Sequence, residues 1–328
     1  MEKMKYVTLK GTDLEISRIA LGTRDYGWNV PEDIAEELLS AYYKIGGTFF
    51  DTAHIYGQYA AGNRSLSEMT IGKWMKKHTI KRNSVVLSSK GCSNVPGLRS
   101  ESRVKPEFLK ADFTESLRNL GTDYLDFYYL HKDDVAQPVE PLIDALNHYV
   151  KEGKLRYFGC SNWTADRIRL AQDYAKASGQ MGFSATQLMF NMAFPNLSTI
   201  EGASTQVYLT DRMMKFLTSI DMPFFAYSSQ ARGYFSLVFT KDFKTNELID
   251  RTVKFFDNSE SRIRARRAMQ ICEETGMTIS DVILGYVMSQ SIQGIPIVQP
   301  DTMSQFETAF HAVDANLTPE QIRFILES

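Results

Sequence analysis

Short apolar runs alternate along this chain with longer segments in which apolar residues recur at helical spacing. Continuous apolar runs of this length are typical of parallel strands that are buried on both faces. Eight runs predict strands at Ile16–Leu21, Thr48–Thr52, Ser84–Ser89, Tyr124–Leu130, Tyr157–Cys160, Ala185–Phe190, Phe224–Tyr227 and Ile295–Val298. Pro106 and Gly121 stand where one of the intervening helices would begin and end. The alternation predicts an α/β fold, a single (β/α)8 TIM barrel that fills residues 1–328 as one domain.

Two segments do not belong to the eight strand–helix repeats of the predicted barrel. Tyr6–Lys10 and Leu14–Ile16, joined by a turn at Gly11, predict an N-terminal β-hairpin that plugs the bottom of the barrel. Residues 232–258 are rich in Phe and Lys and predict an extra loop at the C-terminal face of the barrel. Loops of that length inside a compact fold usually serve a function.

The charge and cysteine content limit the kinds of partner. Lys and Arg number 37 against 39 Asp and Glu, so the chain lacks the net positive charge of a general nucleic-acid-binding protein. No apolar run is long enough to cross a membrane. The widely spaced Cys92, Cys160 and Cys272 do not form the pattern of a disulfide framework. We therefore expect a cytoplasmic protein without a nucleic-acid or membrane partner, and no sequence feature indicates its oligomeric state.

Four ionisable side chains lie at or just after the ends of the second, third and fourth predicted strands, where barrel active sites lie: Asp51, Tyr56, Lys90 and His131. A tyrosine can protonate a developing alkoxide if a neighbouring cation lowers its pKa from about 10 toward neutrality. Lys90 would be this cation, and Asp51 would hold it in place. His131 would orient the substrate oxygen. Because no side chain carries a hydride, the hydride would come from a cofactor.

Longer motifs surround these four positions. The run from Gly46 to Gly57 reads Gly-Gly-Thr-Phe-Phe-Asp-Thr-Ala-His-Ile-Tyr-Gly, and Ser89-Lys90 follows an apolar run. Asp123–His131 reads Asp-Tyr-Leu-Asp-Phe-Tyr-Tyr-Leu-His, and Lys154–Asn162 reads Lys-Leu-Arg-Tyr-Phe-Gly-Cys-Ser-Asn. In this order the motifs resemble the signatures of the aldo-keto reductase family, over nearly the whole chain. The resemblance implies a barrel enzyme that uses NAD(P)H to interconvert a carbonyl and an alcohol.

The resemblance also implies, position by position, which residues act. The catalytic residues would be Asp51, Tyr56, Lys90 and His131, with Tyr56 as the general acid and base. The nicotinamide cofactor would contact Gly22, Thr23, Arg24, Asp51, Ser161, Asn162, Gln187, Tyr227, Ser228, Ser229, Gln230, Ala231, Arg232, Val298, Gln299, Pro300, Asp301 and Gln305. The substrate would contact Tyr26, Trp28 and His54, together with Tyr56 and His131. No metal ligand is expected.

The stretch after the eighth predicted strand departs from the family's pattern. Val298–Gln305 contains no Lys or Arg and includes an acid, Asp301, where the family usually places basic or hydroxyl groups against the 2′-phosphate of NADP. A carboxylate there would repel this phosphate but could accept hydrogen bonds from free ribose hydroxyls. The sequence thus predicts that NAD(H) is used at least as well as NADP(H).

The side chains expected around the barrel mouth suggest a class of substrate. Tyr26 and Trp28 offer apolar or sugar-stacking surfaces. Arg24, Arg99 and Arg103 could meet an anionic or polyhydroxylated compound. A small carbonyl compound, or a sugar or sugar-like polyol, is therefore expected.

Two other classes of protein stay open on the sequence. A metal-dependent barrel isomerase or hydrolase could use Asp51, His54, His131, Asp133 and Asp134 as ligands, although no paired His-x-His motif is present. A cofactor-binding regulatory subunit with little turnover could have the same fold, as do the potassium-channel β-subunits that resemble this family.

Overall fold

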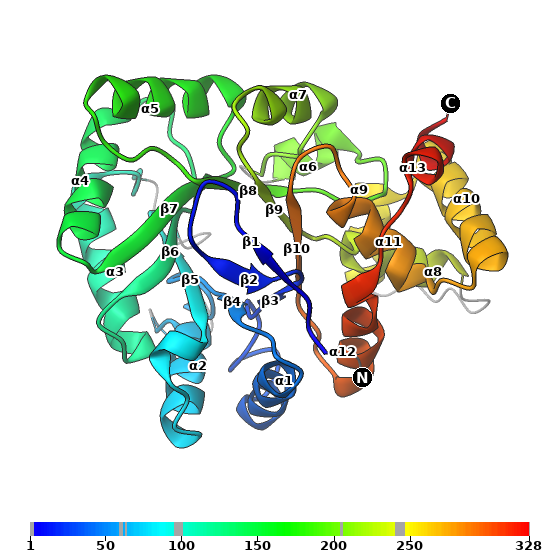
Figure 1. The fold of residues 1–328 in the computed structure, drawn as a ribbon, viewed down its shortest axis with the longest axis horizontal. Coiled ribbons are helices and arrows are strands. Elements are labelled where there is room, and N and C mark those ends of the chain that lie inside the picture. Colours follow the sequence, from blue (N-terminus) through cyan, green and yellow to red (C-terminus); the bar gives the residue numbers. More distant parts are fainter. Residues whose placement is uncertain are drawn as a thin grey trace.

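Eight parallel strands close into a barrel, and helices surround it (Figure 1). The computed structural model describes residues 3–58, 62, 64–94, 101–203, 206–239 and 247–327. The strands follow chain order around the barrel, and the last pairs with the first: β3 (Ala20–Gly22), β4 (Phe49–Asp51), β5 (Val86–Gly91), β6 (Leu125–Leu130), β7 (Leu155–Ser161), β8 (Ala185–Met189), β9 (Phe224–Tyr227) and β10 (Gly294–Val298). The predicted (β/α)8 barrel is confirmed.

The helices begin and end at residues that favour such boundaries. They are α1 (Glu32–Lys44), α2 (Leu66–Lys77), α3 (Pro106–Leu120), α4 (Glu140–Lys151), α5 (Ala165–Ala177), α6 (Leu197–Ala203), α7 (Asp211–Ser219), α8 (Tyr234–Phe239), α9 (Glu247–Phe256), α10 (Ser259–Thr275), α11 (Ile279–Met288), α12 (Met303–Phe310) and α13 (Pro319–Leu326). Pro106 opens α3, and Gly121 ends it in the left-handed conformation at φ 66°. Thr278 and Asp281 form a capping box on α11.

The N-terminal hairpin closes the bottom of the barrel, as predicted. Its strands β1 (Tyr6–Thr8) and β2 (Glu15–Ser17) pair antiparallel and lie across the barrel opening in Figure 1. Leu9, Leu14 and Ile16 are buried and belong to the same apolar cluster as Phe49 and Phe225, whose stacked rings lie 4.9 Å apart inside the barrel. Each fully buried side chain of this kind contributes about 2 kcal/mol to folding.

The first barrel strand starts later than the sequence predicted. Ile16 pairs within the hairpin, and β3 begins only at Ala20. Between them, the guanidinium of Arg18 donates hydrogen bonds to the carbonyl oxygens of Val313 and Ala315. The apolar run is therefore divided, because its first residues pack beneath the barrel and its last residues form the barrel wall.

Helices α8 and α9 lie where the sequence predicted an extra loop. Residues 240–246 of that segment fall outside the described residues. Phe235, Phe255 and Phe256 are buried in the core, and the Tyr234 hydroxyl donates to Asp257 Oδ1 over 3.0 Å. These three Phe side chains belong to the buried faces of short helices, whose periodicity the intervening polar residues obscure.

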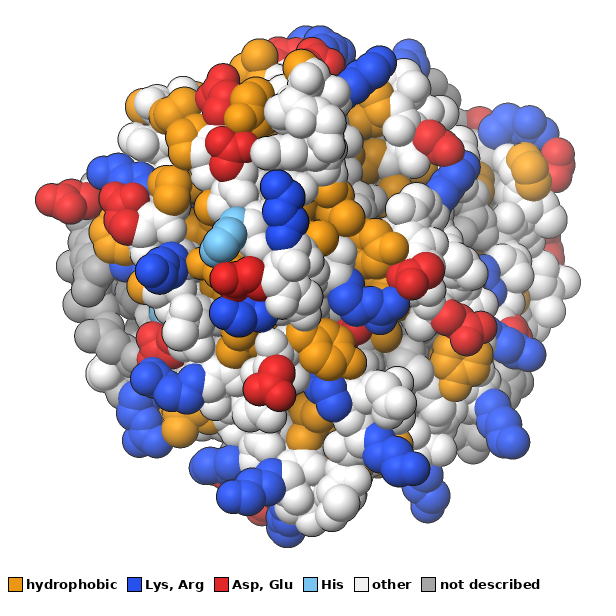
Figure 2. Space-filling view, turned by 60° about the vertical axis from the view of Figure 1, so that its left-hand side comes forward, with side chains coloured by type: hydrophobic (Ala, Val, Ile, Leu, Met, Phe, Trp, Pro, Cys, Tyr) orange, Lys and Arg blue, Asp and Glu red, His pale blue; other side chains and the backbone are white. Residues whose placement is uncertain are grey.

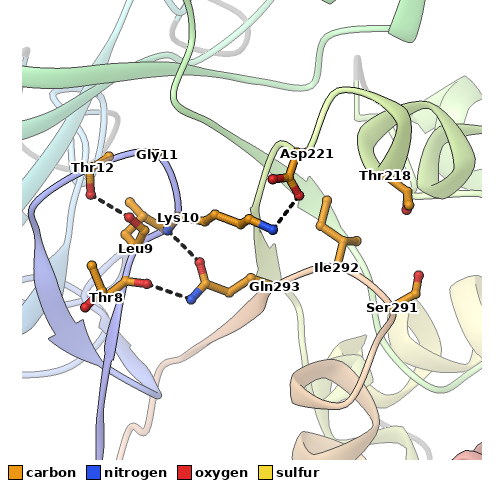
Figure 3. Close-up of a pocket in the computed structure, with 10 residues that line it drawn as sticks. All are labelled: Thr8, Leu9, Lys10, Gly11, Thr12, Thr218, Asp221, Ser291, Ile292 and Gln293. Atoms are coloured by element: carbon orange, nitrogen blue, oxygen red, sulfur yellow. Dashed lines mark hydrogen bonds and ion pairs between the residues drawn. The ribbon is translucent and has the colours of Figure 1, made fainter.

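A surface hollow of about 390 Å³ lies at the amino-terminal ends of the strands, between the hairpin turn, the end of α7 and the segment before β10 (Figure 3). Gln293 accepts a hydrogen bond from the backbone N–H of Lys10 and donates one to the carbonyl oxygen of Thr8. Lys10 Nζ also lies 2.6 Å from Asp221 Oδ1. These contacts fasten the hairpin to the barrel at the end opposite to the carboxyl ends of the strands.

The surface carries mixed charges. On the face in Figure 2, Lys and Arg side chains are interspersed with acidic and apolar ones. No helix within the described ranges combines the length and the apolar character that crossing a membrane requires.

Asp126 of β6 is the centre of an ionic cluster at the bottom of the barrel. Its side chain is 2% exposed, and Oδ2 accepts hydrogen bonds from Arg82 Nη2 (2.7 Å) and from the backbone N–H of Leu87 (2.9 Å). Oδ1 accepts from Arg156 Nη1 over 2.9 Å. The carboxylate thereby connects the start of β5 with β6 and β7.

Replacing Asp126 by Asn should destabilise the protein, because Arg82 and Arg156 both lose this carboxylate and only Arg156 keeps another carboxylate partner, Asp13, among the described ion pairs. We expect the free energy of unfolding to fall by about 3 kcal/mol, as measured by urea denaturation. Asp314→Asn is the control, since Asp314 and Lys5 form an exposed pair at 3.6 Å, which contributes less than about 1 kcal/mol. An equal loss in both variants would contradict this assignment.

Candidate active site

Lys90 and Asp51 form a buried ion pair at the carboxyl ends of β5 and β4. Lys90 Nζ donates to Asp51 Oδ2 and to the Thr52 carbonyl oxygen, each over 2.7 Å, and the two charged side chains are 0% and 4% exposed. Asp51 Oδ1 accepts hydrogen bonds from Ser88 Oγ (2.8 Å) and Gln187 Nε2 (3.1 Å). Burial opposes the charge of Lys90, but Asp51 and the neighbouring phenol together raise its pKa. The ammonium therefore keeps its proton.

The Tyr56 phenol lies beside this pair. Lys90 Nζ is 5.1 Å from the centroid of the Tyr56 ring, and the His131 ring meets the Tyr56 ring edge-on at 5.7 Å between centroids. Burial raises the pKa of Tyr56 above 10, and the positive charge of Lys90 opposes this shift without reversing it. The expected lowering of this pKa toward neutrality is therefore wrong for the protein without bound ligand, because loss of hydration outweighs the cation.

His131 is held as a neutral imidazole. Burial, followed by the positive charges of Lys90, Lys132 and Arg24, lowers its pKa well below 6.5. Burial also lowers the pKa of Lys132 to about 8. Within the described part of the chain, His131 Nδ1 meets no hydrogen-bond partner, and the His131 carbonyl oxygen accepts from Asn162 Nδ2 over 3.2 Å. A fixed neutral imidazole can donate one hydrogen bond and accept another.

Four of the predicted cofactor residues lie together at the ends of β7, β8 and β9. Ser161 pairs with Gln187 in the strand register. Asn162, at φ 62°, donates from Nδ2 to Ser161 Oγ, and its Oδ1 accepts from the Tyr227 hydroxyl over 2.6 Å. The left-handed backbone of Asn162 turns its amide into this network. Gln187 connects this network to the Lys90–Asp51 pair, because its Nε2 donates to Asp51 Oδ1.

The segment after β9, which the sequence predicts to contact the cofactor, has several residues in the left-handed backbone conformation. Ser228, Ala231 and Arg232 have φ values of 52°, 49° and 55°, which residues with a Cβ rarely adopt. The Ser229 hydroxyl holds the segment by donating to the Ile297 carbonyl oxygen over 2.7 Å, and the Arg232 guanidinium lies 4.7 Å from the Phe255 ring centroid. Gln230 precedes the short 3₁₀ turn Ala231–Gly233. Strain of this kind clusters at ligand-binding segments.

The Asp25 carboxylate, from the segment after β3, lies near Asp301, which follows β10. Gln299 Nε2 donates to Asp25 Oδ2 (2.8 Å) and to Asp301 Oδ1 (3.1 Å), and the Asp301 N–H donates to Gln305 Oε1 over 2.7 Å. Burial and the nearby charge of Asp25 raise the pKa of Asp301. Gly22 lies against this segment, since a Cβ there would come within 3.5 Å of Gln299 Cβ. Asp25 was missed from the sequence, although it directly follows Thr23 and Arg24.

The structure also locates the residues predicted to contact substrate. Tyr26 is 0% exposed and donates to the Pro300 carbonyl oxygen, so its ring packs inside the wall. Trp28 is partly buried and donates from Nε1 to the Arg24 carbonyl oxygen. His54 is 8% exposed, and its ring lies against α3. Residue 99, an arginine expected at the mouth, lies outside the described residues.

The side chains considered as metal ligands are engaged elsewhere. Asp51 holds Lys90, and the His54 ring nitrogens face the carboxylates of α3. Asp133 accepts hydrogen bonds from Arg167 at 3.1 and 3.2 Å. Asp134 Oδ1 accepts from the backbone N–H of Ala136. Within the described residues, these four side chains and His131 form no cluster that could hold a metal ion.

Comparison with known proteins gives a consistent assignment. The model of the Aldo/keto reductase family matches residues 18–327. The chain is 28% identical to the uncharacterized oxidoreductase YrpG of Bacillus subtilis (strain 168), over 98% of this chain and 95% of that protein. It is 28% identical to aldo-keto reductase str7 of Strobilurus tenacellus, over 90% and 81% of the two chains. It is 24% identical to an aryl-alcohol dehydrogenase (NADP(+)) of Phanerodontia chrysosporium, over 96% and 83%.

The lowered pKa of His131 predicts how stability depends on pH. The unfolded chain takes up this proton near pH 6.5 and the folded protein only at a much lower pH, so His131 destabilises the fold as pH falls below about 6.5. The contribution is up to about 1.4 kcal/mol per pH unit. His131→Gln should remove it, which urea unfolding at several pH values between about 5 and 7 would measure. His148→Gln, at a histidine whose side chain is 66% exposed, is the control. A slope unchanged in His131→Gln would contradict the prediction.

Proposed function

We propose that this chain, which belongs to the aldo/keto reductase family, uses a nicotinamide cofactor to interconvert a carbonyl and an alcohol, with Tyr56 as the general acid and base. The observation that carries the proposal is the position of Tyr56 between His131 and the buried Lys90–Asp51 pair. Such a pair is costly to bury, and it keeps one positive charge fixed next to a phenol.

The raised pKa of Tyr56 suits proton donation in the reductive direction. The phenol is protonated at neutral pH and can donate to a carbonyl oxygen as negative charge develops there. Lys90 then stabilises the phenolate that remains, because its charge lowers the pKa of Tyr56. His131, neutral and held by its backbone, orients the same oxygen. The bound cofactor supplies the hydride.

The segments around the barrel mouth fit a nicotinamide cofactor. Ser161, Asn162 and Gln187 offer amide and hydroxyl groups suited to a carboxamide, and Tyr227 offers an aromatic face beside them. The left-handed segment from Ser228 to Gly233 orients backbone groups as anion-binding turns do. The carboxylates near Asp301 favour ribose hydroxyls over a 2′-phosphate. These features support cofactor binding, and the Tyr56, Lys90, Asp51 and His131 arrangement supports turnover over a purely regulatory role.

The substrate is proposed to be a small aldehyde or ketone, or the corresponding alcohol. Three relatives are named aryl-alcohol dehydrogenases, one as putative and one as probable, which favours aromatic alcohols and aldehydes as first probes. Aldoses and polyols form the second set, because Trp28 and Arg24 offer an aromatic and a cationic group at the mouth. A screen that follows reduced cofactor in both directions distinguishes the two sets.

Replacing Tyr56 by Phe should remove the transferable proton while preserving the ring. Turnover should fall by about 10² or more, whereas cofactor affinity should stay close to wild type. Steady-state kinetics and cofactor fluorescence titration measure the two effects. Tyr43→Phe, at a hydroxyl that contacts Ser84 on the outer side of the barrel, is the matched control. Turnover that survives Tyr56→Phe would refute the assignment of the general acid.

The acidic segment after β10 should determine cofactor preference. We expect NAD(H) to be used at least as well as NADP(H), and Asp301→Asn to shift the ratio of kcat/KM values toward NADP(H) by about tenfold. Steady-state kinetics with both cofactors measure this ratio, and Asp33→Asn, at an exposed acid in the first turn of α1, is the control. A preference of about a hundredfold for NADPH in the wild type, equivalent to 2.7 kcal/mol, would contradict the proposal.

A further inference from the structure

The segment that carries Tyr56 is not part of a strand or helix, so other contacts must fix its position. It extends from the end of β4 to residue 58 and begins alongside β5, where the Thr52 N–H donates to Ser88 O (3.0 Å) and the His54 N–H donates to Lys90 O (2.9 Å). The Tyr56 N–H donates to Ala53 O over 3.0 Å. Backbone bonds continue beyond His54, where the Ser67 N–H donates to the Tyr56 carbonyl oxygen over 3.4 Å, and side-chain contacts add to them.

The His54 side chain anchors this turn to α3. Its Nδ1 lies 3.4 Å from Asp112 Oδ1, and its Nε2 lies 3.0 Å from Glu115 Oε2. The two carboxylates are three residues apart and therefore lie on one face of the helix. Gln58 Nε2 and Ser65 Oγ both donate to the His54 carbonyl oxygen. The residue two positions before Tyr56 is thus held through both its ring and its backbone.

Asp112 joins this anchor to the end of the strand that carries Lys90. It is 1% exposed, and its Oδ2 accepts a hydrogen bond from the Cys92 N–H over 2.8 Å. Cys92 has φ 62°, a conformation that needs an external contact to hold it. The close packing of α3 on β5 requires glycine at position 91, because a Cβ there would lie 2.9 Å from Asp112 Cβ.

Asp112 also connects to the rim of the barrel mouth. Its Oδ1 accepts a hydrogen bond from Arg103 Nη2, and the Arg103 guanidinium lies 4.4 Å from the Phe108 ring centroid. Arg103 belongs to the segment that leads into α3. One buried carboxylate therefore contacts three separate segments: the Tyr56 turn, the end of β5 and the rim that precedes α3.

We propose that Asp112 is a positioning residue, which acts through His54 and Cys92 to hold Tyr56 and Lys90 in register with each other. The inference rests on the proposed function of Tyr56 as the general acid. Asp112 lies one layer outside the barrel and does not touch the reacting atoms. Displacing a catalytic group by about 1 Å is enough to lower turnover by about 10². Loss of the Asp112 carboxylate should therefore lower kcat and leave cofactor binding unchanged.

Asp126 provides a matched control at the other end of the same strand. Both aspartates are 1% exposed when the whole residue is counted, and both accept hydrogen bonds from an arginine and from a backbone N–H of β5 or the residue that follows it. Asp126 binds Leu87 near the start of the strand, and Asp112 binds Cys92 just beyond its end. A purely structural role would therefore make the two Asp→Asn variants behave alike.

The test compares Asp112→Asn with Asp126→Asn at a temperature where both are folded. We expect both to lose stability, but only Asp112→Asn to lose kcat, by about tenfold or more, with cofactor affinity unchanged. His54→Gln should reproduce this loss, and the double variant Asp112→Asn/His54→Gln should be no slower than the slower single variant, because the two residues act along one path. Equal kcat values in the two Asp→Asn variants, or independent effects that multiply, would overturn the proposal.

A readout without turnover separates this inference from the proposed function. The Tyr56 ring resonance, observed by NMR with isotope-labelled tyrosine and assigned with Tyr56→Phe, should shift in Asp112→Asn and not in Asp126→Asn. If the wild type turned over no carbonyl compound, the proposed function would fail while this comparison would still test the positioning. An unshifted resonance in Asp112→Asn would overturn the inference. If that variant does not fold, His54→Gln serves for the same comparison.

Discussion

The ion pair between Lys90 and Asp51 is the constraint around which the upper half of the barrel is organised. Removing two charges from water costs several kcal/mol each, and their attraction compensates only when their remaining hydrogen-bonding groups are satisfied. Here Thr52, Ser88 and Gln187 meet that requirement from three different strands or their ends. The pair therefore both needs the closed barrel and fixes the strands that supply its partners.

Contacts that stabilise the fold lie at the bottom of the barrel, and the candidate active-site residues lie at the top. At the bottom, the hairpin and stacked aromatic rings form a dry core, and Asp126 neutralises two arginines. At the top, polar groups face one another in strained backbone segments near Asn162 and Ser228. The same device, a buried aspartate that binds an arginine and a backbone N–H, occurs at both ends of β5. The proposed difference in role comes from the surroundings, because Asp126 neighbours the bottom core and Asp112 neighbours the segment that carries Tyr56.

The sequence predicts those features that depend on local pattern. The apolar runs locate the strands, and the order of the motifs brings Asp51, Lys90 and His131 to one end of the barrel. The division of the first run at Ile16, the helices near Phe235 and Phe255, and the left-handed Ser228 could not be predicted, because each depends on contacts distant in sequence or on a conformation that a non-glycine residue rarely adopts. His54 contacts Asp112 across 58 positions, so its sequence surroundings carried no signal of that contact.

The protonation states of the three central groups complement one another. Burial raises the pKa of Tyr56 and lowers that of His131, so both rings are neutral near pH 7, while Asp51 and Tyr56 keep the Lys90 ammonium charged. In the proposed reaction, proton transfer from the phenol would leave an anion beside that ammonium, which would lower the energy of the charge as it forms. The reverse of the proposed reaction would start from the phenolate, which burial disfavours. The same desolvation therefore favours the protonated phenol that the proposed reduction requires at neutral pH, and a higher pH favours the phenolate that oxidation would require.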